Sequence, residues 1–546
     1  MKNTIKKTLA MLMALVSMGV CATGCGPSGP QLKDGQVLLK ISAFNGGYGL
    51  GWLDALKTEY MENNPNVVID YNYTTVDRGD QLTALKSGAA DADLYITGFN
   101  LHGQLYDGME LVNLDDVYTS VGDKIIPSIK AQFEHDGEQY ALPWATSTLG
   151  MLYHQDFFVE NNIQVPRTTN ELLDAAKTIT QLRKNGRTNS YAFTYSAFTE
   201  TGECYWDYMF YPWMAQYEGV ENYEKYWDCR LKDGTQYDVS ISSEYQSVLR
   251  VLEVYEEILR PSNEYNHYKS TEDSFTYAQG RFLDKEAQMM ANGDWIVQEM
   301  KKGDYTEEET KDIVFMRTPI ISSIVETMPM WSENANVRYT VEPNNDDGLV
   351  ALDTTKKTAY ENALVAIIDY VDGVTATKPT NIDGITISDA DIIRIQEAGE
   401  ITPTMAENHI MVIPACSDRI AEAKDFLKFI YSETGIKLYA NNVYGTGLPI
   451  NYTANEITEI VGESKLLKSA YDMLGENCYL TFYSGGKNAV FSKGGLKPVY
   501  RTDAKTFVEV FSQTSASLYE TAYDFYEMSQ TQIGAAWDNL MMNKID

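Results

Sequence analysis

The chain has 546 residues and a formal net charge of −33, with 77 acidic residues against 44 basic ones. A chain of this length exceeds what one compact core usually supports, so two lobes are expected. Its acidity excludes nucleic acid and anionic lipid as binding partners, because both carry charge of the same sign.

The N-terminus has the pattern of a secretory signal peptide. Three lysines precede an apolar run over residues 9–20, which is too short to span a bilayer as a helix. The following Ala22-Thr23-Gly24-Cys25 resembles the lipobox of bacterial lipoproteins, in which the cysteine is lipidated; an ordinary cleavage site is the alternative. Residues 26–36, rich in Gly, Pro and Ser, predict a flexible tether. We expect the mature chain on the extracytoplasmic face of the cell membrane, held only by lipid on Cys25.

Cysteine and histidine usage gives no metal-binding pattern. Cys204, Cys229, Cys416 and Cys478 show no CxxC spacing. Export permits disulfides, but four thiols in so long a chain define no disulfide framework, so their pairing stays open. The five histidines are scattered without ligand spacing, and we therefore expect neither a metal site nor a cofactor.

The first elements along the chain predict a parallel α/β sheet. Apolar runs at residues 37–42, 67–71 and 93–96 have strand length, and helical patterns lie between them. Ligands bind beyond the carboxyl ends of the strands in such sheets. The side chains expected there, as ligand contacts or as plain loop surface, are Asn45, Tyr48, Asp77, Thr97 and Phe99.

Later segments are mainly helical or aromatic. Thr168 and Glu171 have the spacing of a capping box at a helix start. Two further segments carry amphipathic helical patterns, residues 245–259 and 421–430. Eight tyrosines and three tryptophans fall within residues 191–227, whereas the mixed pattern over residues 328–380 permits no assignment of elements.

Five sequence blocks occur in the order that one protein family shows: residues 87–94, 108–115, 140–158, 282–295 and 421–449. In the most specific block, Phe282, Met289, Gly293 and Trp295 have the family's spacing. Together the blocks resemble the family 1 extracellular solute-binding proteins of the maltodextrin-binding type. The chain departs from the family pattern at Ala92, His154 and the pair Lys285-Glu286.

The resemblance implies a two-lobe α/β fold of the periplasmic-binding-protein type, with a hinge and a central ligand cleft. It also implies an ABC transporter permease as partner. The expected organisation is a signal peptide at 1–24, a lipidated tether at 25–36, lobe 1 at 37–145, lobe 2 at 146–312, a return mostly to lobe 1 at 313–415, and C-terminal helices mostly in lobe 2 at 416–546.

Candidate ligand contacts beyond the first sheet are aromatic, because rings offer sugars a flat apolar surface. The resemblance puts Asp294 and Trp295 at the cleft; Trp295 as a core residue is the alternative. Trp144, at the crossing between lobes, is either a ligand contact or hinge packing. Three others could cap the cleft or pack elsewhere: Trp206, Trp331 and Tyr444.

These observations predict a monomeric receptor that captures an oligosaccharide and is not an enzyme. The aromatic excess favours glycans, although peptides and polyamines are the alternative ligand classes. A glycoside hydrolase would need two facing carboxylates at a defined separation, and no recognised catalytic block appears in the sequence.

Overall fold

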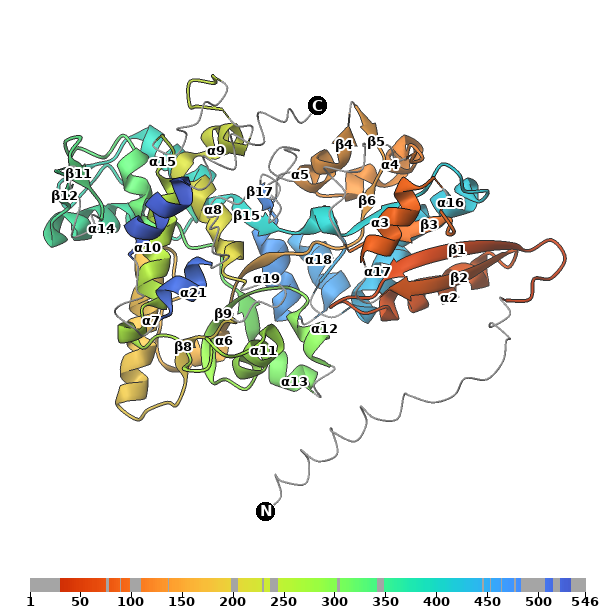
Figure 1. Cartoon of the computed structure of the whole chain (residues 1–546), viewed down its shortest axis with the longest axis horizontal. Helices are drawn as coiled ribbons and strands as arrows, with labels where there is room; N and C mark the ends of the chain where they lie inside the picture. The colour runs from red at the N-terminus through yellow and green to blue at the C-terminus, as the bar shows by residue number, and fades with distance from the viewer. Residues whose placement is uncertain are drawn as a thin grey trace, which may run out of the picture.

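The chain folds as two lobes that lie side by side and join at the middle (Figure 1). We call them the small lobe, built on a five-stranded sheet, and the large lobe, built on a four-stranded sheet. The computed structural model describes residues 30–74, 78–88, 90–98, 110–135, 137–197, 205–227, 230–235, 244–301, 305–340, 348–443, 446–451, 453–462, 464–475, 478–482, 506–513 and 521–531.

The small lobe confirms the predicted parallel opening. Its sheet has the order β2-β1-β3-β16-β6, in which β1 pairs in parallel with β2 and β3, and β16 runs antiparallel to β3 and β6. The strands are β1 (Val37–Phe44), β2 (Val67–Thr74), β3 (Leu94–Ile96), β6 (Leu142–Pro143) and β16 (Ile410–Val412). Leu39, Ile41 and Ala43 of β1 alternate into the core, which fixes the register of the strand.

Helices cover this sheet, and a short hairpin lies beside it. They are α2 (Gly51–Asn63), α3 (Arg78–Lys86), α4 (Asp115–Val121), α5 (Pro127–Lys130), α16 (Ile420–Ile430) and α17 (Glu433–Asn442), with β4 (Glu134–His135) and β5 (Glu138–Gln139) forming the hairpin. Trp52, Leu53 and Leu56 of α2 are fully buried, and α17 packs against the same helix.

The large lobe is built around a buried sheet of order β10-β7-β9-β8. Its strands are β7 (Leu149–His154), β8 (Tyr191–Phe193), β9 (Ala287–Gly293) and β10 (Ile313–Phe315). Every position of β7 and β9 is buried, so both faces of these strands are covered.

Helices make up most of the rest of the large lobe, some packed on that sheet and others further from it. They are α6 (Gln155–Glu160), α7 (Thr169–Lys184), α8 (Asp207–Glu218), α9 (Val220–Trp227), α10 (Ser247–Leu259), α11 (Phe275–Leu283), α12 (Ile296–Met300), α13 (Glu307–Thr310), α14 (Thr354–Val371), α15 (Asp389–Gly399), α19 (Lys465–Met473) and α21 (Phe507–Phe511). Among the described residues no helix combines the length and apolarity needed to cross a membrane.

Helix α7 shows how local sequence sets a boundary. The Thr168 side chain accepts a hydrogen bond from Glu171 N at 3.1 Å, as the predicted capping box requires. The Glu171 carboxylate accepts a hydrogen bond from the backbone N–H of Arg167 at 2.8 Å, and not from the backbone N–H of Thr168. The N-cap is therefore confirmed, but the reciprocal half of the box is displaced by one residue.

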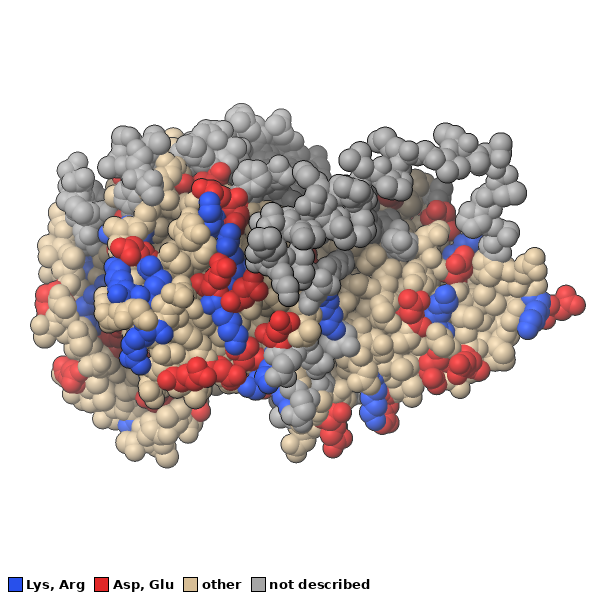
Figure 2. Space-filling model, turned by 90° about the horizontal axis from the view of Figure 1, so that it is seen from below, with Lys and Arg blue, Asp and Glu red and all other residues tan. Residues whose placement is uncertain are grey.

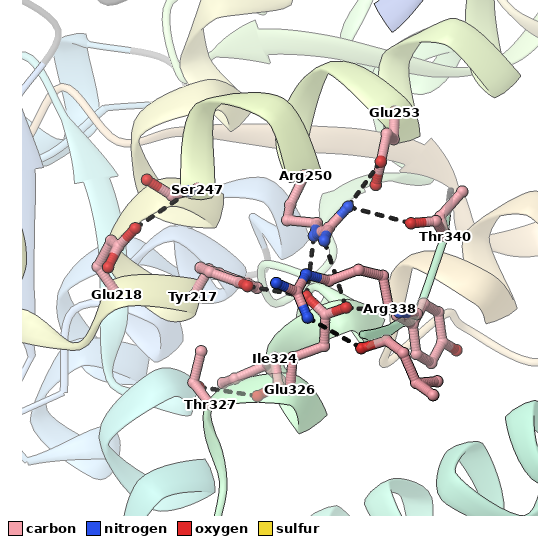
Figure 3. A network of polar contacts seen from close by, with 12 residues as sticks. Tyr217, Glu218, Ser247, Arg250, Glu253, Ile324, Glu326, Thr327, Arg338 and Thr340 are labelled. Carbon is pink, nitrogen blue, oxygen red and sulfur yellow. Dashed lines mark hydrogen bonds and ion pairs between the residues drawn. The ribbon is translucent and has the colours of Figure 1, made fainter. Parts of the chain in front are cut away.

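Polar groups are also buried within the large lobe. Arg250 of α10 donates to Glu326 at 2.8 Å and to Glu253 at 2.7 Å, and Tyr217 of α8 donates to Glu326 at 2.8 Å (Figure 3). Glu326 lies in the 3₁₀ helix η7 (Ser322–Thr327). This buried network fixes α8, α10 and η7 to one another.

Among the elements that the structure describes, three connections cross between the lobes. Residues 144–148 link β6 to β7, residues 405–409 link β15 (Ile401–Thr404) to β16, and α18 (Ala454–Val461) lies between α17 and α19. Thr146 N donates to Gly447 O at 2.7 Å, and Met405 N donates to Ser147 O at 3.0 Å. The crossings are thus hydrogen-bonded to one another.

Packing differs from the expected partition of the chain at two places. Helices α14 and α15 belong to the core of the large lobe rather than returning to lobe 1, and of the described strands in the 313–415 segment only β16 joins the small sheet. Helices α16 and α17 pack in the small lobe rather than in lobe 2. The amphipathic patterns predicted helices here, but such a pattern does not specify which sheet a helix covers.

The remaining short elements complete the described fold. They are β11 (Val337–Arg338), β12 (Val350–Ala351), β13 (Asn381–Ile382), β14 (Ile385–Thr386) and β17 (Tyr479–Phe482), with the 3₁₀ helices η2 (Gly122–Lys124), η3 (Ala131–Phe133), η5 (Pro261–Asn263) and η8 (Ala406–Asn408). Strand β17 pairs in parallel with β15. The stretch that the sequence left unassigned contains β11, β12 and helix α14.

Candidate functional site

The turn after β1 in the small lobe meets the end of β9 in the large lobe. Tyr48 and Trp295 are in edge-to-face contact, with ring centroids 6.1 Å apart. A Cβ atom placed on Gly47 would lie 3.2 Å from Cβ of Trp295, so a glycine permits this close approach. We call the contact region around these residues the junction.

Asp294 is the centre of the junction and is fully buried. Its Oδ1 accepts a hydrogen bond from the Tyr48 hydroxyl at 2.7 Å. Its Oδ2 accepts from the Thr146 hydroxyl at 3.0 Å, the Thr446 hydroxyl at 2.8 Å and the Thr148 backbone N–H at 3.0 Å. One carboxylate therefore ties the small lobe and two crossing segments to the end of β9.

The donors around Asp294 are all neutral. Burial raises the pKa of Asp294 to about 6, and its hydrogen bonds act in the opposite direction. Burial and the nearby carboxylate raise the pKa of Tyr48 well above its usual value, which keeps that hydroxyl protonated as a donor. The charge of Asp294 therefore depends on pH, because only hydrogen bonds from neutral donors offset the unfavourable effect of burying it.

Aromatic rings surround this carboxylate. Tyr48 contacts Trp144 at 5.5 Å and His409 at 5.1 Å between ring centroids. Trp144 Nε1 donates to Thr97 O at 2.9 Å, and its ring stacks on Trp52. Tyr48 and Trp144 are almost completely buried, so in this conformation they support the junction and expose no ring face.

Trp295 differs from its neighbours because it is partly exposed. Its ring packs edge-to-face against Tyr48 on one side and against Tyr208 of α8, at 6.1 Å, on another. Gly293 leaves room for this ring, since a Cβ there would lie 2.2 Å from it. Trp295 is therefore fixed in position while part of its surface stays accessible.

The structure brings most of the described candidates together. Tyr48, Thr97, Trp144, Asp294 and Trp295 converge at the junction, and Asn45 lies partly exposed in the adjoining turn. Trp206 and Trp331 do not: Trp206 is fully buried beside Phe193 and Tyr255, and Trp331 packs against Tyr360 in the large lobe. Four predicted residues lie outside the described part of the chain: Cys25, Asp77, Phe99 and Tyr444.

Sequence reasoning missed the hydroxyl donors and the junction histidine. Thr146, Thr446 and Ser147 were not proposed, and Ser147 Oγ lies 2.7 Å from Nδ1 of His409. The glycines on either side of Thr446 are a local signal that could have identified it. Nothing near Thr146 in the sequence identifies it as a partner of Asp294, which is 148 positions away.

Thiols and metal-type ligands do not build a further site in the described residues. Cys416 is exposed and Cys478 is buried, and both are free thiols; Cys204 and Cys229 lie outside the described residues. Among the residues that the structure describes, no three His, Cys, Asp or Glu side chains gather as metal ligands.

Comparison with known proteins shows both a family and a fold. Residues 55–468 match the family model of bacterial extracellular solute-binding proteins. The fold is similar to that of MalE, the sugar-binding protein of Xanthomonas citri, at 12% identity over 93% of this chain and 100% of that one, with a TM-score of 0.56. No curated protein sequence matches the chain significantly.

Two further solved structures share the fold. The GacH receptor of Streptomyces glaucescens, solved with acarbose, is 13% identical over 92% of this chain and 99% of that one, with a TM-score of 0.55. The cyclic α-maltosyl-1,6-maltose binding protein of Arthrobacter globiformis is 14% identical over 92% and 100% of the two chains, with a TM-score of 0.53. At such identities the likeness establishes a two-lobe architecture.

Proposed function

The chain belongs to the bacterial extracellular solute-binding proteins, and from this we propose that it captures an oligosaccharide between its lobes and delivers it to an ABC importer. The family model spans most of the chain, and three proteins of similar fold are solved receptors for sugars or for acarbose. The resemblance of the sequence to maltodextrin-binding proteins points to the same ligand class.

The observation that carries the proposal is the partly exposed Trp295 ring, held between Tyr48 of one lobe and Tyr208 of the other. A fixed aromatic face suits the apolar C–H face of a pyranose. Asp294 beside it is fully buried and accepts four hydrogen bonds from the protein, so it holds the lobes rather than offering a charge to the ligand. This favours an uncharged ligand over a polyamine.

Capture would follow from hinge motion about the three crossing segments. A ligand that contacts both lobes shifts the population towards the closed form. Tyr48 and Trp295 are already in contact across the junction, which is the arrangement expected of that closed form. The permease of the importer would then distinguish the closed from the open receptor.

We also propose that the mature protein is a monomer attached by lipid on Cys25 to the extracytoplasmic face of the membrane. The support is the signal-peptide pattern and the lipobox-like sequence that ends in this cysteine. Metabolic labelling with a palmitate analogue should label the wild-type chain and should not label Cys25→Ala.

Calorimetry and thermal shift on the chain from residue 31 onward test the ligand class. A panel of oligosaccharides, peptides and polyamines is titrated, and saturation at a hundred times the dissociation constant should add about 2.7 kcal/mol to stability. We expect one glycan series to bind and Trp295→Ala to weaken it at least about tenfold, because the ring face is lost.

Tyr277→Ala is the matched control, since this aromatic side chain is 71% exposed on α11. It should leave the affinity unchanged. Stabilisation only by peptides or polyamines would overturn the glycan assignment but keep the family. Consumption of a glycan during the titration would make the protein a hydrolase and refute the receptor function.

A further inference from the structure

A cavity lies in the large lobe away from the junction, and none of its lining residues belongs to the junction. Its volume is about 690 Å³, within the range of roughly 300–1,000 Å³ that small-molecule sites occupy. It is formed by the end of α7, strand β8, the end of α10, residues 260–271 and α21. We call it the tyrosine cavity, after Tyr191, Tyr195, Tyr265 and Tyr268 in its lining.

Tyr268 gives the cavity an aromatic platform. Its side chain is 67% exposed, an uncommon position for so large a ring. The ring is nonetheless supported, because His267 lies 4.6 Å and Tyr191 lies 6.2 Å from it between centroids. An exposed ring that is braced from behind can pack against the apolar face of a sugar.

Two buried polar atoms in the lining have no hydrogen-bond partner: Nε of Arg183, a donor, and Oδ1 of Asn266, an acceptor. Both side chains are otherwise fixed. Arg183 Nη2 donates to Glu264 O at 3.0 Å, and its guanidinium lies 4.1 Å from the centroid of the Tyr191 ring. Asn266 Nδ2 donates to Ile258 O at 2.6 Å.

These unpaired atoms indicate the chemistry of the occupant. A buried donor or acceptor without a partner is unfavourable, so a ligand that supplies the missing partners is stabilised at that position. A hydroxyl both donates and accepts, and a sugar carries several hydroxyls around an apolar ring. The unpaired donor on Arg183, the unpaired acceptor on Asn266 and the exposed Tyr268 ring are therefore together complementary to a sugar.

The charges in the lining are already balanced. Arg183 pairs with Glu264 at 3.3 Å, and Arg260 pairs with Glu257 at 3.3 Å. Glu509 is used in the cap of α21, where it accepts from Thr506 N at 2.7 Å. Acidic and basic side chains are likewise interspersed over the face of the large lobe that Figure 2 shows. A neutral ligand fits this balance better than an anion or a cation.

We propose that the tyrosine cavity is a second carbohydrate-binding site, which holds a neutral glycan on the large lobe independently of the junction. Tyr268 packs against a sugar ring, and Arg183 Nε and Asn266 Oδ1 pair with its hydroxyls. Such a site would keep a long glycan on the receptor while the junction opens and closes.

Affinity electrophoresis in native gels tests the site with four neutral polysaccharides as probes: soluble starch, arabinose-free xylan, galactomannan and mixed-linkage β-glucan. At least one should retard the wild-type chain, and Trp295→Ala should remain retarded by it. Tyr268→Ala should raise the apparent dissociation constant about tenfold, because one stacked ring is lost. Tyr277→Ala, a similarly exposed tyrosine of the same lobe, should behave as wild type.

A second variant removes the acceptor instead of the ring. Asn266→Leu should also weaken retardation, and circular dichroism identifies any loss of fold. The proposal is overturned if none of the four polysaccharides retards the wild-type chain, since the unpaired atoms would then be satisfied by water. It is equally overturned if Trp295→Ala abolishes retardation while Tyr268→Ala preserves it, which would assign all binding to the junction.

Discussion

Two buried carboxylates in this protein are held in opposite ways. Glu326 in the large lobe pairs with the guanidinium of Arg250 at 2.8 Å and with the Tyr217 hydroxyl (Figure 3). Asp294 at the junction accepts only from hydroxyls and a backbone N–H. A buried charge needs hydrogen bonds or a partner of opposite sign, and these two sites use one solution each.

The two carboxylate networks also connect different parts of the molecule, which accounts for the difference in their hydrogen-bond donors. The Glu326 network joins α8, α10 and η7 within one lobe, and nothing in the proposed function requires them to separate. The Asp294 network joins residues of both lobes and of the crossing segments, which have to rearrange if the lobes move apart as the proposed function requires. Hydroxyl donors can exchange with water on opening at little cost, whereas separating a buried ion pair is expensive.

Breaking the ion-pair network should have the largest effect. Burial lowers the pKa of Arg250, but Glu253 and Glu326 raise it by more, so the guanidinium stays charged. Arg250→Met leaves both carboxylates buried without a counterion and should reduce the free energy of unfolding by about 3–5 kcal/mol. Urea denaturation followed by circular dichroism measures this loss.

The control for that variant is Lys437→Met, which removes an exposed ion pair with Glu433 on α17. Exposed pairs contribute roughly 0–1 kcal/mol, so this change should be nearly silent. A loss of similar size in the two variants would show that the large lobe does not depend on its buried pair.

The pH dependence of stability should come from the other carboxylate. The folded pKa of Asp294 is about 6, above its usual value of 3.8, so the folded chain binds a proton more readily than the unfolded chain does. The contribution of this group is therefore fully present below pH 4 and is lost as the pH rises through 6. The expected loss between pH 4 and pH 7 is about 2–3 kcal/mol.

Asp294→Asn isolates this contribution, because it keeps the shape of the side chain and removes the titration. Unfolding free energies of both chains are measured at intervals from pH 4 to pH 7, and their difference is taken at each pH. That difference should shift in favour of the variant by the same 2–3 kcal/mol as the pH rises. Parallel curves would mean that the carboxylate does not titrate in this range.

Much of the fold was predictable because short-range patterns determine it. The apolar run at residues 37–42 and the Thr168 N-cap act within a few residues, and the predicted strand and N-cap are both confirmed. The lobe to which α14 and α16 belong was not predictable, since an amphipathic helix can cover either sheet. Likewise, Trp206 in the aromatic stretch has the composition of a sugar contact but is fully buried.

The junction was predictable only in part. The Gly293-Asp294-Trp295 turn was identified because the family's spacing marks it, and the structure brings it against Tyr48. The role of Asp294 was not predicted, since its donors are 146 to 246 residues away along the chain. Nothing local distinguishes a carboxylate that binds ligand from one that binds threonine hydroxyls.

The smallest expected effect comes from removing one tyrosine hydroxyl from each network. This pair of changes compares the Asp294 network with the Glu326 network most directly. Tyr48→Phe and Tyr217→Phe each delete a single hydrogen bond to a buried carboxylate, and each should reduce the free energy of unfolding by about 1–2 kcal/mol. Only Tyr48 spans the lobes, so only its variant should favour the open form, increase the radius of gyration measured by X-ray scattering, and weaken ligand binding a few-fold. Loss of a donor should also raise the pKa of Asp294 further, moving the fall in stability to higher pH. Equal changes in ligand affinity for both variants would place the hinge contact elsewhere and leave Asp294 as an ordinary buried carboxylate.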